Sequence, residues 1–99
     1  MNENDGDMLM QKEGLRAARQ VDGLTIMNPE TGAYYALSET AAFIWERLHC
    51  LTSISAVKES TAAKYGVSLQ VVSAQIDAFI AEMAAEGLVN VANSDKTEG

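Results

Sequence analysis

The sequence predicts an α+β fold in which a three-stranded antiparallel sheet is followed by three helices. In the N-terminal part, the two turn sequences Asp22-Gly23 and Asn28–Gly32 separate short runs of residues that favour strands. Further along the chain, apolar side chains recur at helical spacing in three stretches, and a serine precedes each stretch. The chain has 99 residues, of which 47% are hydrophobic, so it is expected to form one domain around one modest core.

The three strands are expected at Leu15–Val21, Leu24–Asn28 and Ala33–Leu37. The dipeptide Asp22-Gly23 is typical of a tight hairpin between the first two strands. The turn Asn28–Gly32 contains a proline, which fixes one φ angle, and a glycine, which tolerates a positive φ. The third strand is therefore expected to return antiparallel to the second.

The first two helices are predicted from their caps and their apolar faces. The first is expected to begin after Ser38, because a serine hydroxyl accepts hydrogen bonds from the free N–H groups of a first helical turn. Its apolar residues follow i, i+3, i+4, i+7 spacing: Ala41, Ile44, Trp45 and Leu48. The second helix is expected from Ile54, after Ser53, to about Tyr65, and Gly66 fits the left-handed residue beyond its end.

The third helix has the clearest pattern. Ser68 caps its beginning, and Gly87 ends it before the short apolar segment 88–91. Its apolar stripe consists of Val72, Ile76, Phe79, Ile80 and Met83. A three-stranded sheet beside three helices is winged-helix-like in architecture.

Both ends of the chain differ in composition from the middle. Residues 1–14 are rich in acidic and polar residues and are expected to form a flexible acidic tail, and residues 92–99 are expected to form a flexible C-terminal tail. The apolar triplet Met8, Leu9 and Met10 is an exception. It fits a short strand, a docking patch or an unstructured triplet, and we expect the last of these. The predicted domain therefore spans residues 15–91.

Several short segments of this chain match one known family in order and spacing. They are the Asn-Pro-Glu-Thr-Gly turn and the segments Tyr34–Leu37, Thr40–Ala42, Ile44–Glu46, Lys64–Val67 and Glu86–Val89. Through these segments the chain resembles the PqqD-like family, the small recognition elements that serve enzymes modifying ribosomally made precursor peptides. The resemblance covers about residues 15–91. Two departures concern packing: Asn28 stands where aspartate is common, and Thr61 stands where leucine is usual.

The resemblance implies a non-catalytic role as a peptide chaperone or recognition element. In the family, the leader of the precursor peptide adds as a strand beside the segment equivalent to Ala33–Leu37 and lies against the third helix. The implied peptide-binding residues here are Ala33, Tyr34, Tyr35, Ala36, Leu37, Gln75, Ile76 and Phe79. The implied partners are the leader peptide and a separate maturation enzyme, such as a radical SAM enzyme or a peptidase. Because Tyr34 and Tyr35 point to opposite sheet faces, at least one of them is expected to serve ordinary packing.

Two other binding roles remain as alternatives. The first is a structural or regulatory protein-interaction domain with the same fold and no peptide substrate. The second is DNA binding, in which a winged-helix protein places a helix in the major groove and neutralises phosphates with Lys and Arg. The third helix carries Asp77, Glu82 and Glu86 and no Lys or Arg, and the chain has a net charge of −7, so DNA binding is disfavoured.

The chain offers little for catalysis. Its one histidine, His49, is adjacent to its one cysteine, Cys50, and sequence neighbours do not face each other as nucleophile and base. We interpret His49 as a residue at a helix C-terminus and Cys50 as a small buried hydrophobic residue. The scattered acidic residues predict no metal site, the single glycines predict no phosphate loop, and no cofactor is expected.

The expected location is the cytoplasm, without membrane association. No apolar run reaches the roughly 20 residues that span a bilayer. The first residues are acidic where a signal peptide needs a basic segment followed by an apolar one. A single cysteine cannot form an internal disulfide, which agrees with a reducing compartment.

Overall fold

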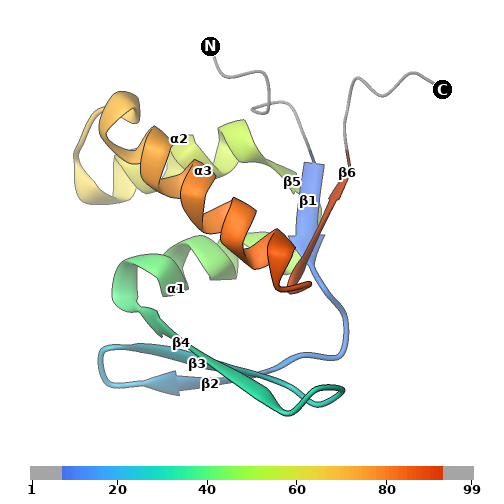
Figure 1. Cartoon of the computed structure of the whole chain (residues 1–99). Coiled ribbons are helices and arrows are strands. Elements are labelled where there is room, and N and C mark those ends of the chain that lie inside the picture. Colours follow the sequence, from blue (N-terminus) through green and yellow to red (C-terminus); the bar gives the residue numbers. More distant parts are fainter. Residues whose placement is uncertain (1–7, 93–99) are drawn as a thin grey trace, which may run out of the picture.

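The computed structural model describes residues 8–92, which form two small antiparallel sheets packed with three α-helices (Figure 1). The strands of the first sheet, in spatial order, are β2 (Arg16–Gln20), β3 (Gly23–Asn28) and β4 (Ala33–Ser38). Those of the second sheet are β5 (Thr52–Ser53), β1 (Met8–Gln11) and β6 (Val89–Ala92). The helices are α1 (Glu39–Glu46), continued by a short 3-10 turn η1 (Arg47–His49), then α2 (Ile54–Tyr65) and α3 (Leu69–Ala85).

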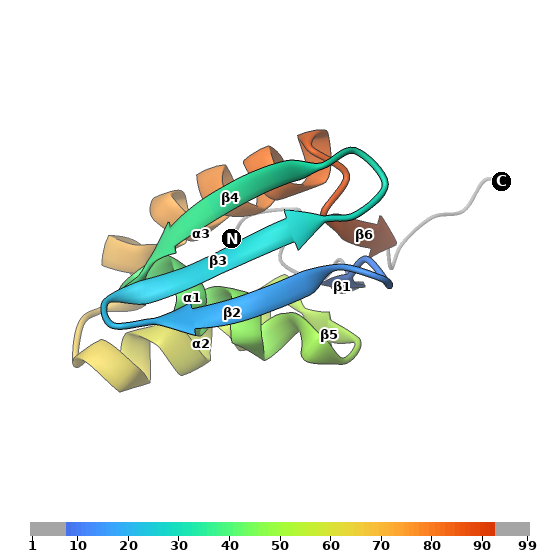
Figure 2. The ribbon, with the colours of Figure 1, turned by 90° about the horizontal axis from the view of Figure 1, so that it is seen from below.

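The α+β prediction of a three-stranded antiparallel sheet followed by three helices is confirmed. In the β2–β3–β4 sheet, β3 is central, and Ile26 lies opposite both Ala17 and Tyr35. Alternation along β4 directs Tyr35 and Leu37 toward the core and Tyr34 outward, where 71% of its surface is exposed. The helices lie on one side of this sheet and leave its other face uncovered (Figure 2).

The turn between β3 and β4 depends on Asn28. Its side-chain Oδ1 accepts a hydrogen bond from the Glu30 N–H at 3.0 Å, and its carbonyl accepts from Thr31 and Gly32. Gly32 has a φ of +78°, a left-handed conformation that glycine adopts readily. Asparagine offers the same side-chain oxygen acceptor as the aspartate that is common at this position. The turn is therefore formed with Asn28 as well.

The three predicted serine caps are confirmed. The hydroxyls of Ser38, Ser53 and Ser68 each accept a hydrogen bond from the N–H group three residues further on, at 3.2, 3.1 and 3.3 Å. Gly66, with a φ of +66°, ends α2, as predicted. At the end of α3, Gly87 and Leu88 donate backbone hydrogen bonds into the last helical turn, which is a Schellman motif.

One core joins both sheets and all three helices. Its largest fully buried apolar side chains are Leu9, Ile26, Leu48, Val57, Ile76 and Leu88. Trp45 is 3% exposed, which confirms its place on the buried stripe of α1. Thr61 is also buried, and its hydroxyl donates to the Val57 carbonyl at 2.8 Å, so a polar atom where leucine is usual is satisfied within α2.

The expectation of an unstructured tail is wrong for Met8–Gln11. These residues form β1, the central strand of the second sheet, and Leu9 is fully buried opposite Val91 of β6. The partner strands lie far away in sequence, so the local composition did not indicate the pairing. The second sheet also includes Ala92. Residues 12–14 of the predicted tail are also described: they form a turn, and the Lys12 N–H donates to the Leu88 carbonyl at 2.8 Å. Residues 1–7 and 93–99 lie outside the described residues.

One smaller prediction is also corrected. Cys50 is exposed rather than buried, because the chain leaves η1 in an extended conformation there. On α1, the predicted residues Ile44, Trp45 and Leu48 are buried and Ala41 packs partly buried against the core, and Ala42 is fully buried as well. No helix within residues 8–92 is long and apolar enough to cross a membrane.

Candidate functional site

The outer side of β4 is an open strand edge. β4 pairs with β3 on one side, and no strand of residues 8–92 pairs with its other side. Helix α3 runs beside this open edge (Figure 2). Backbone N–H and C=O groups on an open edge can pair with an extended segment of another chain, so this is where the fold offers strand addition.

A groove of about 330 Å³ lies between β4, the start of α1 and the C-terminal half of α3. Its lining residues are Tyr35, Ala36, Leu37, Ser38, Ala41, Phe79, Glu82 and Met83. Leu37 and Met83 are nearly fully buried, so they form an apolar floor that belongs to the core. Small side chains at Ala36 and Ala41 leave the space open, and Glu82 adds one acidic group.

The groove contains four of the eight predicted peptide-binding residues. These are Tyr35, Ala36, Leu37 and Phe79. Ala33 and Tyr34 belong to the same strand but do not line the groove, and Tyr34 is on the uncovered sheet face.

Gln75 and Ile76 lie elsewhere. They line a separate hollow of about 190 Å³ among α1, α2 and the start of α3. Ile76 is 1% exposed and belongs to the core.

The groove wall on α3 is one helical turn further along the chain than predicted. Glu82 and Met83 stand three and four residues after Phe79, which places them on the same helix face. That spacing was visible in the sequence, but the end of α3 that lies beside β4 depends on the tertiary packing. Ser38 and Ala41 were also missed as lining residues, because their sequence signal was that of a cap and a buried stripe.

Tyr35 connects the two sides of the groove. Its hydroxyl donates a hydrogen bond to Glu86 Oε1, at 3.1 Å, just beyond the last residue of α3. Partial burial, the hydrogen bond to Glu86 and the negative charge of Glu86 together raise the pKa of Tyr35 above its usual value. The phenol is therefore protonated at neutral pH and can donate its hydrogen to Glu86.

The acidic residues of α3 have different surroundings. Asp77 forms an ion pair with Lys58 of α2 at 3.0 Å, and the Lys58 side chain is only 3% exposed. Glu82 lines the groove beside β4. Glu82 is therefore the acidic side chain placed to meet a basic residue of a bound segment.

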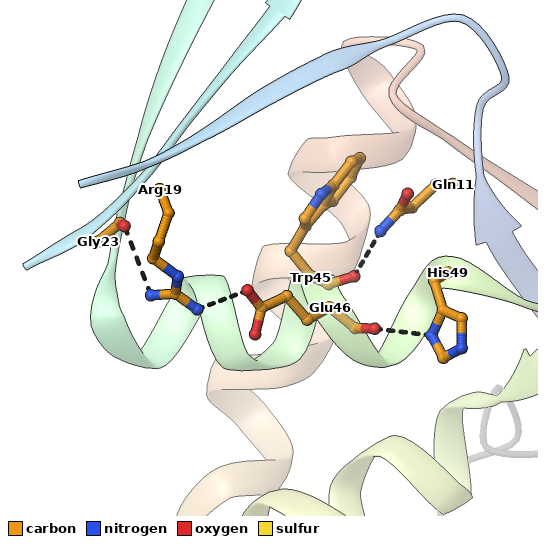
Figure 3. Close-up of polar contacts among 6 residues, drawn as sticks. All are labelled: Gln11, Arg19, Gly23, Trp45, Glu46 and His49. Atoms are coloured by element: carbon orange, nitrogen blue, oxygen red, sulfur yellow. Dashed lines mark hydrogen bonds and ion pairs between the residues drawn. The ribbon is translucent and has the colours of Figure 1, made fainter.

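At the C-terminal end of α1, outside the groove, polar contacts connect the helix to β1, β2 and η1 (Figure 3). Gln11 donates to the Trp45 carbonyl at 2.8 Å and ties β1 to α1, and Arg19 of β2 pairs with Glu46. His49 Nδ1 lies 2.9 Å from the Glu46 carbonyl oxygen, which can only accept a hydrogen bond. The histidine is thus held by backbone at the end of η1. Residues 8–92 contain no group of three or more His, Cys, Asp or Glu side chains that could hold a metal ion.

Comparisons with known proteins agree with this architecture. The family profile described as coenzyme PQQ synthesis protein D (PqqD) matches residues 23–89. A solved structure described as TbiB1 in complex with the TbiA(beta) leader peptide is similar in fold, with a TM-score of 0.71. The two chains are 17% identical, and the match covers 90% of this chain and 99% of that one. No curated protein matches the chain.

Proposed function

The chain belongs to the PqqD family, and we propose that it is a non-catalytic module that binds the leader of a ribosomally made precursor peptide. The family resemblance predicted from the sequence is thereby confirmed. One structural observation carries the proposal: the open edge of β4 lies beside a groove with an apolar floor, and α3 bounds the far side of this groove. TbiB1, which shares the fold, has been solved with a leader peptide bound, and this supports the same role here.

The groove provides two kinds of interaction. Backbone groups of β4 pair with any extended peptide, and this pairing supplies affinity without selecting a sequence. Alternate side chains of the added strand face α3, where Phe79 and Met83 offer apolar contacts. The leader is therefore expected to carry apolar residues at every second position, and a basic residue near Glu82.

In this role the module presents the leader to a separate maturation enzyme, for which a radical SAM enzyme and a peptidase are the candidate classes. Its contribution is effective concentration rather than chemistry. Holding the leader makes delivery of the modifiable segment a tethered event, with a local concentration of about millimolar order. A moderate leader affinity is then sufficient.

The experiment that tests the function is an amide-chemical-shift titration. The isotope-labelled chain is titrated with synthetic leaders translated from the short reading frames beside its gene, and with the TbiA(beta) leader. We expect one leader to shift the amides of β4 and of Phe79 to Met83, whereas its scrambled sequence shifts none. Absence of binding by every leader, or shifts confined to β2 and α2, would overturn the proposal.

A further inference from the structure

Tyr35 and Glu86 form a polar bridge between the two walls of the groove. Tyr35 comes from β4, and Glu86 directly follows α3. Their hydrogen bond measures 3.1 Å and joins residues 51 positions apart. The bond links β4 directly to the C-terminal cap of α3. Beside this bond, Leu37 of β4 and Met83 of α3 both belong to the apolar core.

Both ends of the bridge have a fixed position. Tyr35 lies opposite the fully buried Ile26 and packs against the core. The backbone at Glu86 is held by the Schellman motif, in which Gly87 donates to Ala84 at 3.0 Å and Leu88 to Met83 at 2.9 Å. The hydrogen bond therefore constrains the distance between strand and helix.

Glu86, at the C-terminal cap of α3, does not stabilise the helix by its charge. A carboxylate at a helix C-terminus faces the negative end of the helix dipole, which is unfavourable. The last turn of α3 has no basic residue to offset it. The Tyr35 hydroxyl is the side-chain group that bonds the Glu86 carboxylate, which ties the glutamate to β4 and the groove.

Building on the proposed peptide-binding function, we propose that the Tyr35–Glu86 hydrogen bond is a clasp that sets the width of the groove for an added strand. An added strand lies about 4.8 Å from its neighbour, and its inward side chains must fit between β4 and α3. Close-packed contacts weaken steeply when a gap opens by even an ångström. Tyr35 and Glu86 are therefore positioning residues for the peptide.

The test uses the leader that binds the wild-type chain most tightly in the titration above. Tyr35→Phe keeps the ring and removes the hydroxyl, and Glu86→Ala removes the acceptor. Each is expected to weaken leader affinity by about three- to tenfold, the range of one hydrogen bond. The double variant is expected to be no weaker than the worse single variant, because both changes remove the same bond. Glu86→Gln keeps an acceptor oxygen and should restore most of the affinity.

Matched controls remove the same groups elsewhere. Tyr65→Phe and Glu59→Ala alter exposed residues of α2 outside the groove and should leave leader affinity unchanged. Affinity is measured at a temperature at which melting curves show every variant to be folded. A loss in Tyr35→Phe without a loss in Glu86→Ala would mean that the hydroxyl contacts the peptide directly, and would overturn the clasp.

The outcomes separate this inference from the proposed function. If the wild type binds a leader and neither variant changes its affinity, the clasp is overturned while the peptide-binding function stands. If the wild type binds no leader, the function itself fails. Additive losses in the double variant would also contradict the clasp, because they would show two independent contacts.

Discussion

Individual residues in this protein have unequal roles, and Trp45, Tyr35 and Glu82 illustrate the range. Trp45 is enclosed in the core, with 3% of its surface exposed. Tyr35 combines core packing on its ring with a hydrogen bond on its hydroxyl. Glu82 lines the groove and is exposed to solvent. The stability of the fold, the geometry of the groove and the recognition of charge on a ligand are therefore expected to depend on different side chains.

Trp45→Ala should lower the free energy of unfolding by about 3 to 5 kcal/mol, because it removes a large packed volume from the core. Thermal and denaturant melts measure the loss. Val21→Ala is the control, since Val21 is 99% exposed, and it should change stability by less than about 0.5 kcal/mol. An unchanged melting midpoint in Trp45→Ala would contradict the burial of this side chain.

The raised pKa of Tyr35 predicts a pH effect on stability. A group whose folded pKa lies above its unfolded value stabilises the fold below the unfolded pKa, about 10 for tyrosine. That contribution disappears as the pH rises through the folded pKa, because a phenolate would face the Glu86 carboxylate. The free energy of unfolding, measured between about pH 8 and 12, should therefore decrease more steeply with rising pH for the wild type than for Tyr35→Phe. Parallel curves would contradict the assigned cause.

At the level of elements, the two edges of β4 have different roles. One side completes a ladder with β3, and the other is open beside α3. N–H groups alternate in direction along a strand, so those of Ala33 and Ala36, three residues apart, point to opposite sides. This separates the contribution of β4 to the fold from its contribution to peptide binding.

Ala33→Pro and Ala36→Pro test that separation, since proline removes one N–H donor from the strand. The variant at the outward position should lose leader affinity by about tenfold or more and keep most of its stability; Ala33→Pro also removes the N–H that donates to Thr31 Oγ1 at 3.2 Å. The variant at the inward position should melt at a lower temperature. Melts and a binding titration on both variants provide the measurement, and wild-type affinity in both would contradict strand addition at β4.

At the level of the whole molecule, the sequence was sufficient for the elements with local signals. The serine caps, the Asn28–Gly32 turn and the stripe of α3 depend on residues a few positions apart, and all were predicted. The strand Met8–Gln11 was missed because its partners, β5 and β6, are distant in sequence. The side of the groove formed by β4 was predicted, because this strand carries a family motif. The residues of α3 that line the other side were predicted only at Phe79, because the part of the helix beside β4 depends on tertiary packing.

The kinds of contact expected in the groove also predict how salt affects leader binding. Leader binding through backbone pairing and apolar contacts, with Glu82 at the rim, should weaken only modestly from low to high ionic strength. Glu82→Gln should reduce that dependence further. A steep log-log salt slope together with binding to duplex DNA would contradict the peptide-binding function, and α3, which has no Lys or Arg, argues against that outcome.

Hydrogen exchange with and without the bound leader tests the central claim most directly, because it reports each backbone N–H separately. If the leader adds as a strand to β4, protection should increase at Tyr34–Leu37 and along Phe79–Met83. The exposed β2, at the opposite edge of the same sheet, is the internal reference and should not change. Protection confined to residues 9–21, or to the end of α2 near Tyr65, would contradict the account by placing the peptide on another surface.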